Sequence, residues 1–494
     1  MYPDILTGSL ADSGGPAEPA AGGLTDCPDR VARAVATLRD GYTAEPFPSA
    51  AVRRVRLARL RRLVKGNADA LATTLARDFG GGRSVDETRL AEIMVSLRAI
   101  DHARSRLRGW MRRRGRGVPV VFQPASAWVQ PVPKGVVGIL SPWNYPVLLS
   151  ISPLVDALAA GNRVILKPSE RTPRTAELLA SLLGATFAAD EVAVVTGGPD
   201  VAKAVCAAGL DHLLFTGSTA TGRVVARAAA ETLTPVTLEL GGKSPVIVAP
   251  DADAAEAGRA VARGKAFNAG QTCVAPDYVM VPDGALAGFA QGFRDQITEQ
   301  YPDLMVNPDY SGLIDDRHRD RLVALLEDAA GKGVDVLALN PGARDAAVGA
   351  VRMPPVLLLD PPDDLAVHGE EVFGPILPVM PYRTLDQALA WVRRDAAPLS
   401  LYLFTRNRST LRQVVETTQA GAVVVNDTLI HTALEDLPFG GVGASGQGAY
   451  HGKAGFETFS HLKPVFRRGP FNPTRFLSPP FSRVRRLIIA ALTR

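Results

Sequence analysis

The chain has little cysteine and few aromatic residues: three cysteines in 494 residues, and 6% Phe, Trp and Tyr. Cys27, Cys206 and Cys273 form no C-x-x-C pair and are too few for a disulfide framework. This excludes the disulfide-rich secreted class and favours a reducing compartment. No spacing typical of a metal site is found either, so no metal is expected.

Long hydrophobic runs are also missing. No stretch reaches the roughly 18 apolar residues of a transmembrane helix, and the N-terminus lacks the basic and apolar regions of a signal peptide. Hydrophobic residues make up 46% of the chain and charged residues 21%, the balance of a soluble globular protein. Together with the few cysteines, these features predict a cytoplasmic protein. Since one hydrophobic core stops growing at roughly 250 to 300 residues, we expect the chain to form two or more domains.

Positive charge is in excess, with a net charge of +5 and a pI near 9.1. Arginines gather at Arg53–Arg62 and Arg104–Arg116. In the first run apolar residues recur at helical spacing, so the arginines are interpreted as the solvated face of an amphipathic helix. Neither run contains aromatics that could stack on bases, and no nucleic-acid partner is expected. The apolar residues are Val52, Val55, Leu57, Leu60, Leu63 and Val64.

The N-terminal part predicts a leader followed by helices. Residues 1–24 are rich in Ala, Gly and Pro without apolar periodicity, which indicates a flexible leader. Helical patterns follow over Ala50–Asp78 and Asp86–Trp110, and the glycine cluster Gly80–Gly82 between them breaks the first helix.

From Val136 onwards, short apolar runs alternate with helical segments, which predicts a parallel α/β sheet whose strand ends face a ligand crevice. Thr172 and Pro173 predict the start of one of these helices, and Gly184 its end. The predicted strands are Val136–Leu140, Val164–Leu166, Val192–Val195, His212–Phe215, Val236–Leu240 and Val246–Val248.

A second α/β stretch, from about Asp251 to Thr428, predicts a second domain. After about Gly455 the chain is rich in Pro and Arg and ends in the apolar Leu487–Leu492, too short to span a bilayer. A surface or subunit contact is favoured for this end, and weak contact with a membrane surface stays open. The strands predicted for the second domain are Tyr278–Val281, Val356–Leu359, Ile376–Met380, Ser400–Phe404 and Ala422–Asn426.

One cysteine stands in a glycine-containing loop, Asn268–Cys273, where the backbone can approach a ligand closely. Alone this is a weak signal, because a lone cysteine is usually a small buried apolar residue. We expect that role for Cys206, in the predicted helix Asp200–Ala208.

Glu239 and Asn144 give Cys273 a chemical context. Taken singly, Glu239 is an acid at a strand end and Asn144 a turn former. With Cys273 and further motifs in the same order, they resemble the aldehyde dehydrogenase superfamily from about residue 50 to the C-terminus. The motifs are Ser141–Pro146, Lys167–Glu170, Phe215–Ser218, Leu238–Lys243, Asn268–Cys273, Glu370–Pro375 and Pro438–Gly441.

The resemblance implies an α/β fold with a parallel-sheet dinucleotide-binding domain, an α/β catalytic domain and a small oligomerisation segment. Ala275–Tyr278 and Gly448–Lys453 look like the class-three branch, and the tail from Pro470 to Phe481 is most similar to bacterial coniferyl aldehyde dehydrogenases. The expected divisions are an NAD(P)-binding domain at 25–120 and 135–240, a catalytic domain at 241–435, and oligomerisation or tail segments at 121–134 and 455–494.

The chemistry of aldehyde oxidation demands these residue types. Hydride leaves an aldehyde carbon more readily once a nucleophile has added, and a thiol of pKa about 8.5 is already partly thiolate at neutral pH. By resemblance, the Asn144 amide and the Cys273 N–H hold the oxyanion. Glu239 then activates the water that hydrolyses the thioester on Cys273 to a carboxylic acid.

A second set of residues is expected to bind the cofactor. Phe215–Gly222 follows a strand and opens a helix, where N–H groups receive phosphate, although its glycines stand further apart than in G-x-G-x-x-G. Glu170 could accept from the ribose 2′-hydroxyl and repel a 2′-phosphate, which favours NAD, with NADP as the alternative. The resemblance assigns cofactor contacts to Lys167, Glu170, Gly217, Ser218, Gly222, Glu371 and Phe373.

Three alternative functions stay open: a fatty aldehyde dehydrogenase at a surface, a CoA-acylating dehydrogenase, which Glu239 argues against, and a silent homologue, which would lack Cys273 or Asn144. No arginine near the motifs indicates a carboxylated substrate. Relatives associate through segments like Phe122–Pro133 and the C-terminal end, so a homodimer is expected. Apolar or aromatic aldehydes are suggested by Trp143, Tyr145 and Phe267.

Overall fold

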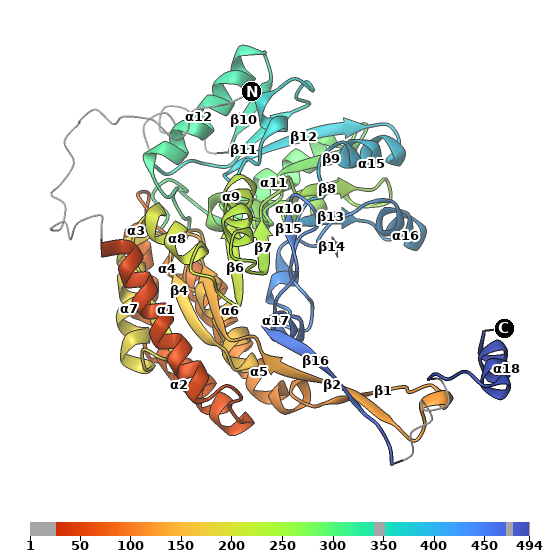
Figure 1. The fold of residues 1–494 in the computed structure, drawn as a ribbon. Coiled ribbons are helices and arrows are strands. Elements are labelled where there is room, and N and C mark those ends of the chain that lie inside the picture. Colours follow the sequence, from red (N-terminus) through yellow and green to blue (C-terminus); the bar gives the residue numbers. More distant parts are fainter. Residues whose placement is uncertain (1–25, 340–350, 471–477, 494) are drawn as a thin grey trace.

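The computed structural model describes residues 26–339, 351–470 and 478–493. The predicted leader at 1–24 and part of the tail motif after residue 470 lie outside the described residues. The described chain forms two large sheets covered by helices and a small three-stranded sheet that extends away from them (Figure 1). The predicted α/β class is confirmed.

The first sheet contains β3 (Val136–Leu140), β4 (Arg163–Lys167), β5 (Val192–Val194), β6 (His212–Gly217), β7 (Val236–Leu240) and β15 (Gly446–Gln447). Its order is β15-β7-β6-β3-β4-β5, parallel except for β15, which pairs antiparallel with β7. Alternate residues of β3 face different cores, Val137 and Ile139 in one, Val136 and Leu140 in the other. Burial on both faces explains why these strands are uniformly apolar in sequence.

Helices cover both faces of this sheet. One core includes residues of α1 (Asp26–Ala44), α8 (Pro199–Cys206) and α9 (Thr219–Ala230). The opposite core includes residues of α2 (Ala50–Gly66), α3 (Ala68–Asp78), α5 (Val95–Trp110), α6 (Leu148–Ala160), α7 (Pro173–Thr186) and α17 (Gly452–Thr458).

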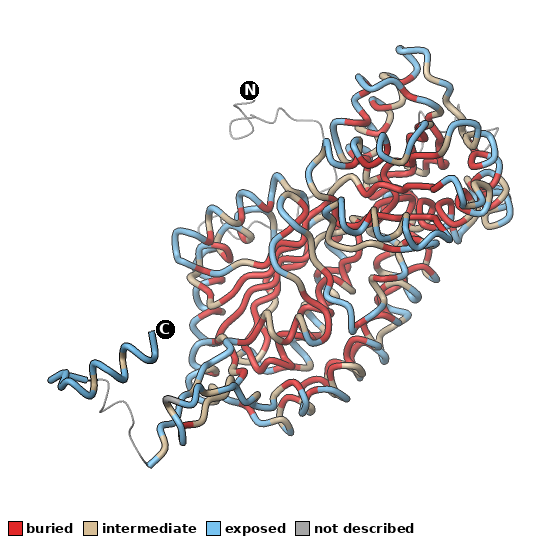
Figure 2. The backbone as a smooth tube through the Cα atoms, turned by 90° about the vertical axis from the view of Figure 1, so that its right-hand side faces the viewer, coloured by how far each residue is buried: buried red, intermediate tan, exposed pale blue. Residues whose placement is uncertain are grey.

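The second sheet contains β8 (Pro245–Val248), β9 (Tyr278–Pro282), β10 (Asp335–Ala338), β11 (Val356–Leu359), β12 (Ile376–Tyr382), β13 (Ser400–Phe404) and β14 (Ala422–Val425). Its order is β10-β11-β12-β9-β8-β13-β14, with β10 antiparallel to β11. On one face lie α10 (Ala254–Ala266), α11 (Leu286–Gln300) and α12 (Asp316–Gly331), and on the other α15 (Leu385–Arg394) and α16 (Arg408–Thr417). Figure 2 shows the strands of both sheets as the buried interior.

The strand predictions are confirmed except in one placement. Val246–Val248, predicted for the first sheet, lies in β8 of the second sheet, because the chain crosses between the sheets at 241–244. The remaining short elements are α4 (Val85–Thr88), the π-helix η1 (Arg89–Met94), the 3-10 helices η2 (Val120–Phe122), η3 (Phe267–Gly270) and η4 (Ile430–Ala433), and α14 (Ala366–Gly369).

Two helix predictions are wrong in detail. The pattern Ala50–Asp78 is two helices, because Asn67 leaves the helical conformation and its side-chain amide caps α2 at the Leu63 carbonyl, 2.8 Å away. The pattern Asp86–Trp110 starts one residue earlier, at α4, and passes through the π-helical turn η1 before α5.

The predicted ends of α7 also differ. Thr172 makes no capping bond, and the Asp78 carboxylate accepts from the N–H groups of Arg174 and Thr175 instead, at 3.1 and 2.8 Å. Gly184 lies inside α7, which continues to Thr186, so it does not end the helix.

The interpretation of the first arginine run is partly wrong. Arg53 and Arg56 are buried, whereas Val55 is 57% exposed. Arg53 donates to the carbonyls of Ala159 and Ala160 at the end of α6, and Arg56 pairs with Glu45 and Glu191, both at 2.8 Å. These arginines therefore join α2 to the end of α6 and to the loops that follow α1 and precede β5.

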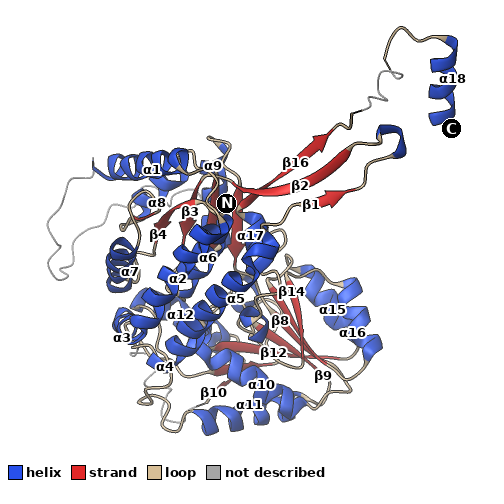
Figure 3. Cartoon of the chain, turned by 90° about the horizontal axis from the view of Figure 1, so that it is seen from below, coloured by secondary structure: helices blue, strands red, loops and turns tan. Residues whose placement is uncertain are grey.

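An arm projects from the body. It consists of β1 (Arg114–Arg116), β2 (Ser126–Pro133) and β16 (Ser460–Arg467), and the helix α18 (Arg483–Leu492) lies beyond its tip (Figures 1 and 3). The tail segment expected to start at residue 455 begins inside α17. Phe456 of this helix and Phe459, which directly follows it, are fully buried, so this part of the chain packs on the first domain. No helix among the described residues is long and apolar enough to cross a membrane.

Candidate active site

Cys273 follows a strained loop between the two sheets. After α10 ends, three consecutive residues, Asn268, Ala269 and Gly270, have positive φ angles of 49°, 51° and 72°. Such a conformation is costly for alanine and persists only where surrounding contacts impose it. At Gly270 a side chain is also excluded, because a Cβ would lie 2.3 Å from the Gly374 carbonyl oxygen. The loop directs Cys273 into the space between the domains.

Buried amides fix this loop. Gln271 donates from Nε2 to the carbonyls of Asn268 and Gly312, at 2.9 and 3.0 Å, and its Oε1 accepts from Ile314 N–H at 3.0 Å. The backbone N–H of Asn268 donates to both carboxylate oxygens of Glu87, at 3.2 Å each. The position of Cys273 is therefore set by groups from distant parts of the chain.

Asn144 lies next to the same loop. Its Nδ2 donates to the Gln271 carbonyl at 3.2 Å, and its own carbonyl accepts from Asn268 Nδ2 at 3.2 Å. Arg83 also donates to the Asn144 carbonyl and pairs with Glu92 at 3.0 Å, with both side chains fully buried. The amide of Asn144 retains a second N–H and lines the same cavity as Cys273.

Glu239 stands at the carboxyl end of β7, next to β6. It is 1% exposed, and neither of its side-chain oxygens has a hydrogen-bond partner among the described residues. Burial raises the pKa of Glu239 to about 8, opposed by a contact with Cys273. A buried carboxyl group near neutrality is suited to accept a proton from water.

The thiol of Cys273 is partly exposed to the cavity. Burial, followed by the charges of Glu239 and Glu371, raises the pKa of Cys273 well above its ordinary value. Burial also raises the pKa of Glu371 to about 8, with Asp277 as the next cause. Thiol and carboxyl groups are therefore coupled, and removing one negative charge lowers the pKa of Cys273.

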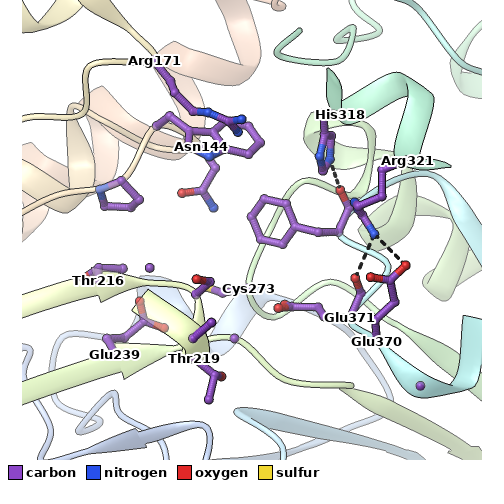
Figure 4. A pocket seen from close by; sticks show the side chains of 18 residues that line it. Asn144, Arg171, Thr216, Thr219, Glu239, Cys273, His318, Arg321, Glu370 and Glu371 are labelled. Carbon is purple, nitrogen blue, oxygen red and sulfur yellow. Dashed lines mark hydrogen bonds and ion pairs between the residues drawn. The ribbon is translucent and has the colours of Figure 1, made fainter. Parts of the chain in front are cut away.

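A cavity of about 630 Å³ opens on one side of Cys273. Figure 4 shows Asn144 and Arg171 on one side of it, and Arg321, Glu370 and Glu371 on the other. It is lined by Pro142, Trp143, Asn144, Arg171, Thr216, Gly217, Ser218, Thr219, Ala220, Glu239, Gly241, Cys273, His318, Arg321, Gly369, Glu370, Glu371 and Phe373.

Four of the residues predicted to bind the cofactor line this cavity: Gly217, Ser218, Glu371 and Phe373. Gly217–Ala220 line the cavity, so the N-terminus of α9 faces it, and Ser218 caps this end by accepting from Thr221 N–H at 3.3 Å. Thr216 Oγ1 is buried without a partner among the described residues. A helix N-terminus and an unpartnered hydroxyl suit a phosphate-containing ligand.

The other three predicted residues lie outside this cavity. Lys167, the last residue of β4, forms an ion pair with Glu170. Gly222 lies in α9, where a Cβ would be 2.5 Å from the Leu240 side chain, so its role in the structure is close packing of helix on strand.

The loop carrying Glu371 and Phe373 is held by residues that the sequence did not single out. His318 Nε2 bonds the Phe373 carbonyl at 2.7 Å, and Phe373 has a positive φ of 46°. Arg321 donates to the carbonyls of Glu371 and Val372. His318 and Arg321 are three residues apart on α12. This spacing, which places both side chains on one face of the helix, is the only signal for them in the sequence.

Lys243 and Asp277 also bind the loop that carries Glu371 and Phe373. They pair at 2.7 Å, and Lys243 also donates to the carbonyls of Val367 and Glu370, at 2.8 Å each. Asp277 accepts from Val372 N–H at 2.8 Å. Both residues belong to predicted motifs, but no function was assigned to them.

A second cavity, of about 420 Å³, opens on the other side of Cys273. Tyr145 and Phe267 line it, as do Phe439 and Tyr450. The Tyr145 hydroxyl bonds Thr272 Oγ1 at 2.6 Å, which leaves its ring as the apolar wall. Most of the lining is apolar, so this cavity suits an apolar or aromatic group.

The structure adds two details to the expectations about this second cavity. Trp143 lines the first cavity instead, where its ring contacts Phe373 and His318 with centroids 5.4 and 5.7 Å apart. An arginine, Arg263, does line the second cavity; its guanidinium donates to Gln296 at 2.9 Å. It comes from the last turn of α10, five residues before the motif Asn268–Cys273.

Comparison with known proteins agrees with this geometry. Residues 26–465 match the model of the aldehyde dehydrogenase family. A protein of Pseudomonas aeruginosa named probable coniferyl aldehyde dehydrogenase is 48% identical over 90% of this chain and 92% of its own length.

Solved structures give the same result. The substrate-bound state of Staphylococcus aureus AldH superimposes with a TM-score of 0.87 at 33% identity, covering 94% of this chain and 99% of that one. An indole-3-acetaldehyde dehydrogenase complexed with NAD+ reaches a TM-score of 0.80 at 26% identity, over 90% of this chain and 89% of its own.

Proposed function

The chain belongs to the aldehyde dehydrogenase family, and from that premise we propose that it oxidises an apolar, aromatic aldehyde to its carboxylic acid on Cys273. The observation that carries this proposal is the position of Cys273, which lines both cavities. One cavity has a helix terminus and carboxyl groups suited to a dinucleotide, and the other is apolar. A nucleophile between them can hold a substrate carbon against the cofactor.

The first step is attack of the Cys273 thiolate on the aldehyde carbon, which forms a C–S bond. The negative charge passes to the former carbonyl oxygen, where the Asn144 amide and the Cys273 N–H stabilise it. Removing one such donor costs on the order of 3 kcal/mol in the barrier. Collapse of this oxyanion then breaks the C–H bond and leaves a thioester on Cys273; a nicotinamide dinucleotide, the cofactor of this family, would accept the departing hydride.

Glu239 serves the second half of the reaction. It takes a proton from water, the resulting hydroxide adds to the thioester carbon, and the C–S bond breaks to return the Cys273 thiolate. The product is the acid. Since no hydrogen-bond partner of its carboxylate oxygens is found in the described part of the chain, both oxygens of Glu239 are available for this water.

For the cofactor we propose NAD over NADP. Ser218 and the N-terminus of α9 would receive the pyrophosphate, and Glu371 the nicotinamide ribose. Glu170 is 43% exposed and could accept from the adenosine ribose beside Lys167. Its negative charge would oppose a 2′-phosphate.

The substrate proposal rests on the apolar cavity and on the relative named for coniferyl aldehyde. We propose the same class of cinnamyl-type aldehyde for this chain.

We also propose that residues 25–120 and 135–240 form the NAD(P)-binding domain and residues 241–435 the catalytic domain. The helix α17 is counted in the first of these domains.

The test is the reduction of NAD and of NADP with a panel of cinnamyl-type and aliphatic aldehydes, with and without coenzyme A. We expect cinnamyl-type aldehydes to give the highest kcat/KM, without a requirement for coenzyme A. Cys273→Ala should abolish turnover. Equal turnover of aliphatic aldehydes would overturn the proposed substrate class, and a requirement for coenzyme A would overturn the hydrolytic step. Activity in Cys273→Ala would overturn the assignment of Cys273 as the nucleophile.

A further inference from the structure

Positive charge is segregated at one end of the molecule. Residues 103–134 and 459–494 each contain eight Lys and Arg and no Asp or Glu. These sixteen positive charges compare with +5 for the whole chain, so the remainder carries a net −11. The described parts of the two segments comprise the end of α5, the arm and α18, and the arm and α18 project together from the body (Figures 1 and 3).

Most of this charge is free to meet a partner. On the arm and the adjoining end of α5, the side chains of the following basic residues are exposed and form no ion pair with a described residue: Arg106, Arg108, Arg112, Arg113, Arg116, Lys463, Arg467 and Arg468. A cluster of this kind attracts an extended anionic surface within about 10 Å at moderate salt.

The helix α18 adds an apolar face. Val484, Leu487, Ile488 and Leu492 follow helical spacing and are 65%, 65%, 38% and 52% exposed, and no described residue of α18 is buried. Arg483 and Arg486 are exposed at the edge of this face. Figure 2 shows the helix exposed along its length. A short, basic amphipathic helix is the element that lies in a membrane interface, with its apolar side among the acyl chains.

We propose that α18, supported by the basic arm, binds the enzyme to the surface of an anionic lipid membrane. The apolar side chains enter the interface, and the arginines contact lipid phosphates. With ten residues the helix lies on the bilayer and does not cross it. An apolar aldehyde that partitions into the membrane is then concentrated beside the enzyme.

Other partners fit these features less well. Nucleic acid would use the arginines but leave the apolar face without a role. A symmetric contact between two copies of α18 would bring positive charge against positive charge. An anionic membrane satisfies both the charge and the apolar face.

The test is flotation of the full-length protein with vesicles of phosphatidylcholine alone, or with about 40% phosphatidylglycerol, at low and at about 0.5 M salt. We expect flotation with the anionic vesicles only, weakened by salt. Arg483→Gln with Arg486→Gln should lower binding at least tenfold, since each arginine at such a surface contributes a factor of about five. Leu487→Ser with Ile488→Ser should lower it as strongly.

Matched controls lie on α16. Arg408→Gln with Arg412→Gln removes the same net charge, and Val415→Ser removes an apolar side chain that is 52% exposed. Both should float like the wild type, and aldehyde oxidation without lipid should be equal in all variants. Flotation unaffected by the α18 changes, or equal with neutral vesicles, overturns the proposal. The proposal is also overturned if the α18 variants no longer form a dimer, or no longer bind DNA, while they still bind lipid.

Discussion

At the scale of single residues, the site depends on which carboxyl group is charged and when. Glu239 and Glu371 both have pKa values near 8, and both raise the pKa of Cys273. A carboxyl group with a raised pKa is neutral below that value and becomes a base above it. The hydrolytic step should therefore accelerate as the pH rises towards 8, and level off above it.

Glu239→Gln separates the two roles of this residue. Because the base is lost, steady-state kcat should fall by about 10²- to 10⁴-fold and lose its rise towards pH 8. Because a negative charge is lost, the pKa of Cys273 should fall, and iodoacetamide should alkylate it faster at neutral pH. Rapid mixing should still show one turnover of NAD reduction per Cys273.

Glu416→Gln, an exposed change on α16, provides the control and should alter neither rate nor alkylation. A Glu239→Gln enzyme that retains wild-type kcat, or whose alkylation slows, would contradict these roles.

At the scale of elements, a single carboxylate joins the π-helical turn η1 to the site. Glu92 Oε2 accepts from the N–H groups of Val147 and Leu148 at the start of α6, at 2.8 and 3.1 Å, and Oε1 pairs with Arg83. Burial raises the pKa of Glu92, while Arg83 and the two N–H groups act in the opposite direction. Arg83 in turn holds the carbonyl of Asn144.

We expect Glu92→Gln to destabilise the protein by about 3–5 kcal/mol, because Arg83 would lose its ion-pair partner while its charge stays buried. The midpoint of thermal unfolding should drop, and kcat should fall as Asn144 shifts. Glu457→Gln is the matched control, since its pair with Arg114 is about 30% exposed and contributes about 0–1 kcal/mol. Equal unfolding midpoints in the two variants would falsify this account.

The sequence predicts elements better than their partners. Apolar runs identified the strands of both sheets, because a strand buried on two faces is apolar throughout. That β8 joins the second sheet, and that Gly446–Gln447 joins the first, depends on where the chain crosses, which no local pattern records. Motifs likewise indicated Cys273, Glu239 and Asn144, whereas Arg83 and His318 act across long sequence distances.

At the scale of the whole molecule, the apolar side chains of the arm bear on assembly. The arm presents Leu462 and Phe466 on one face of β16, 40% and 60% exposed. An arm that packs against the body of a second copy would bury these side chains and form the expected homodimer.

The mass in solution tests this assembly. The wild type should have about twice the 52.3 kDa of one chain in size-exclusion chromatography with light scattering. Leu462→Ser with Phe466→Ser should shift the mass to that of the single chain, since two apolar anchors of the interface are lost. Val415→Ser should remain dimeric. A monomeric wild type, or a double variant that stays dimeric, would show that the arm does not join subunits.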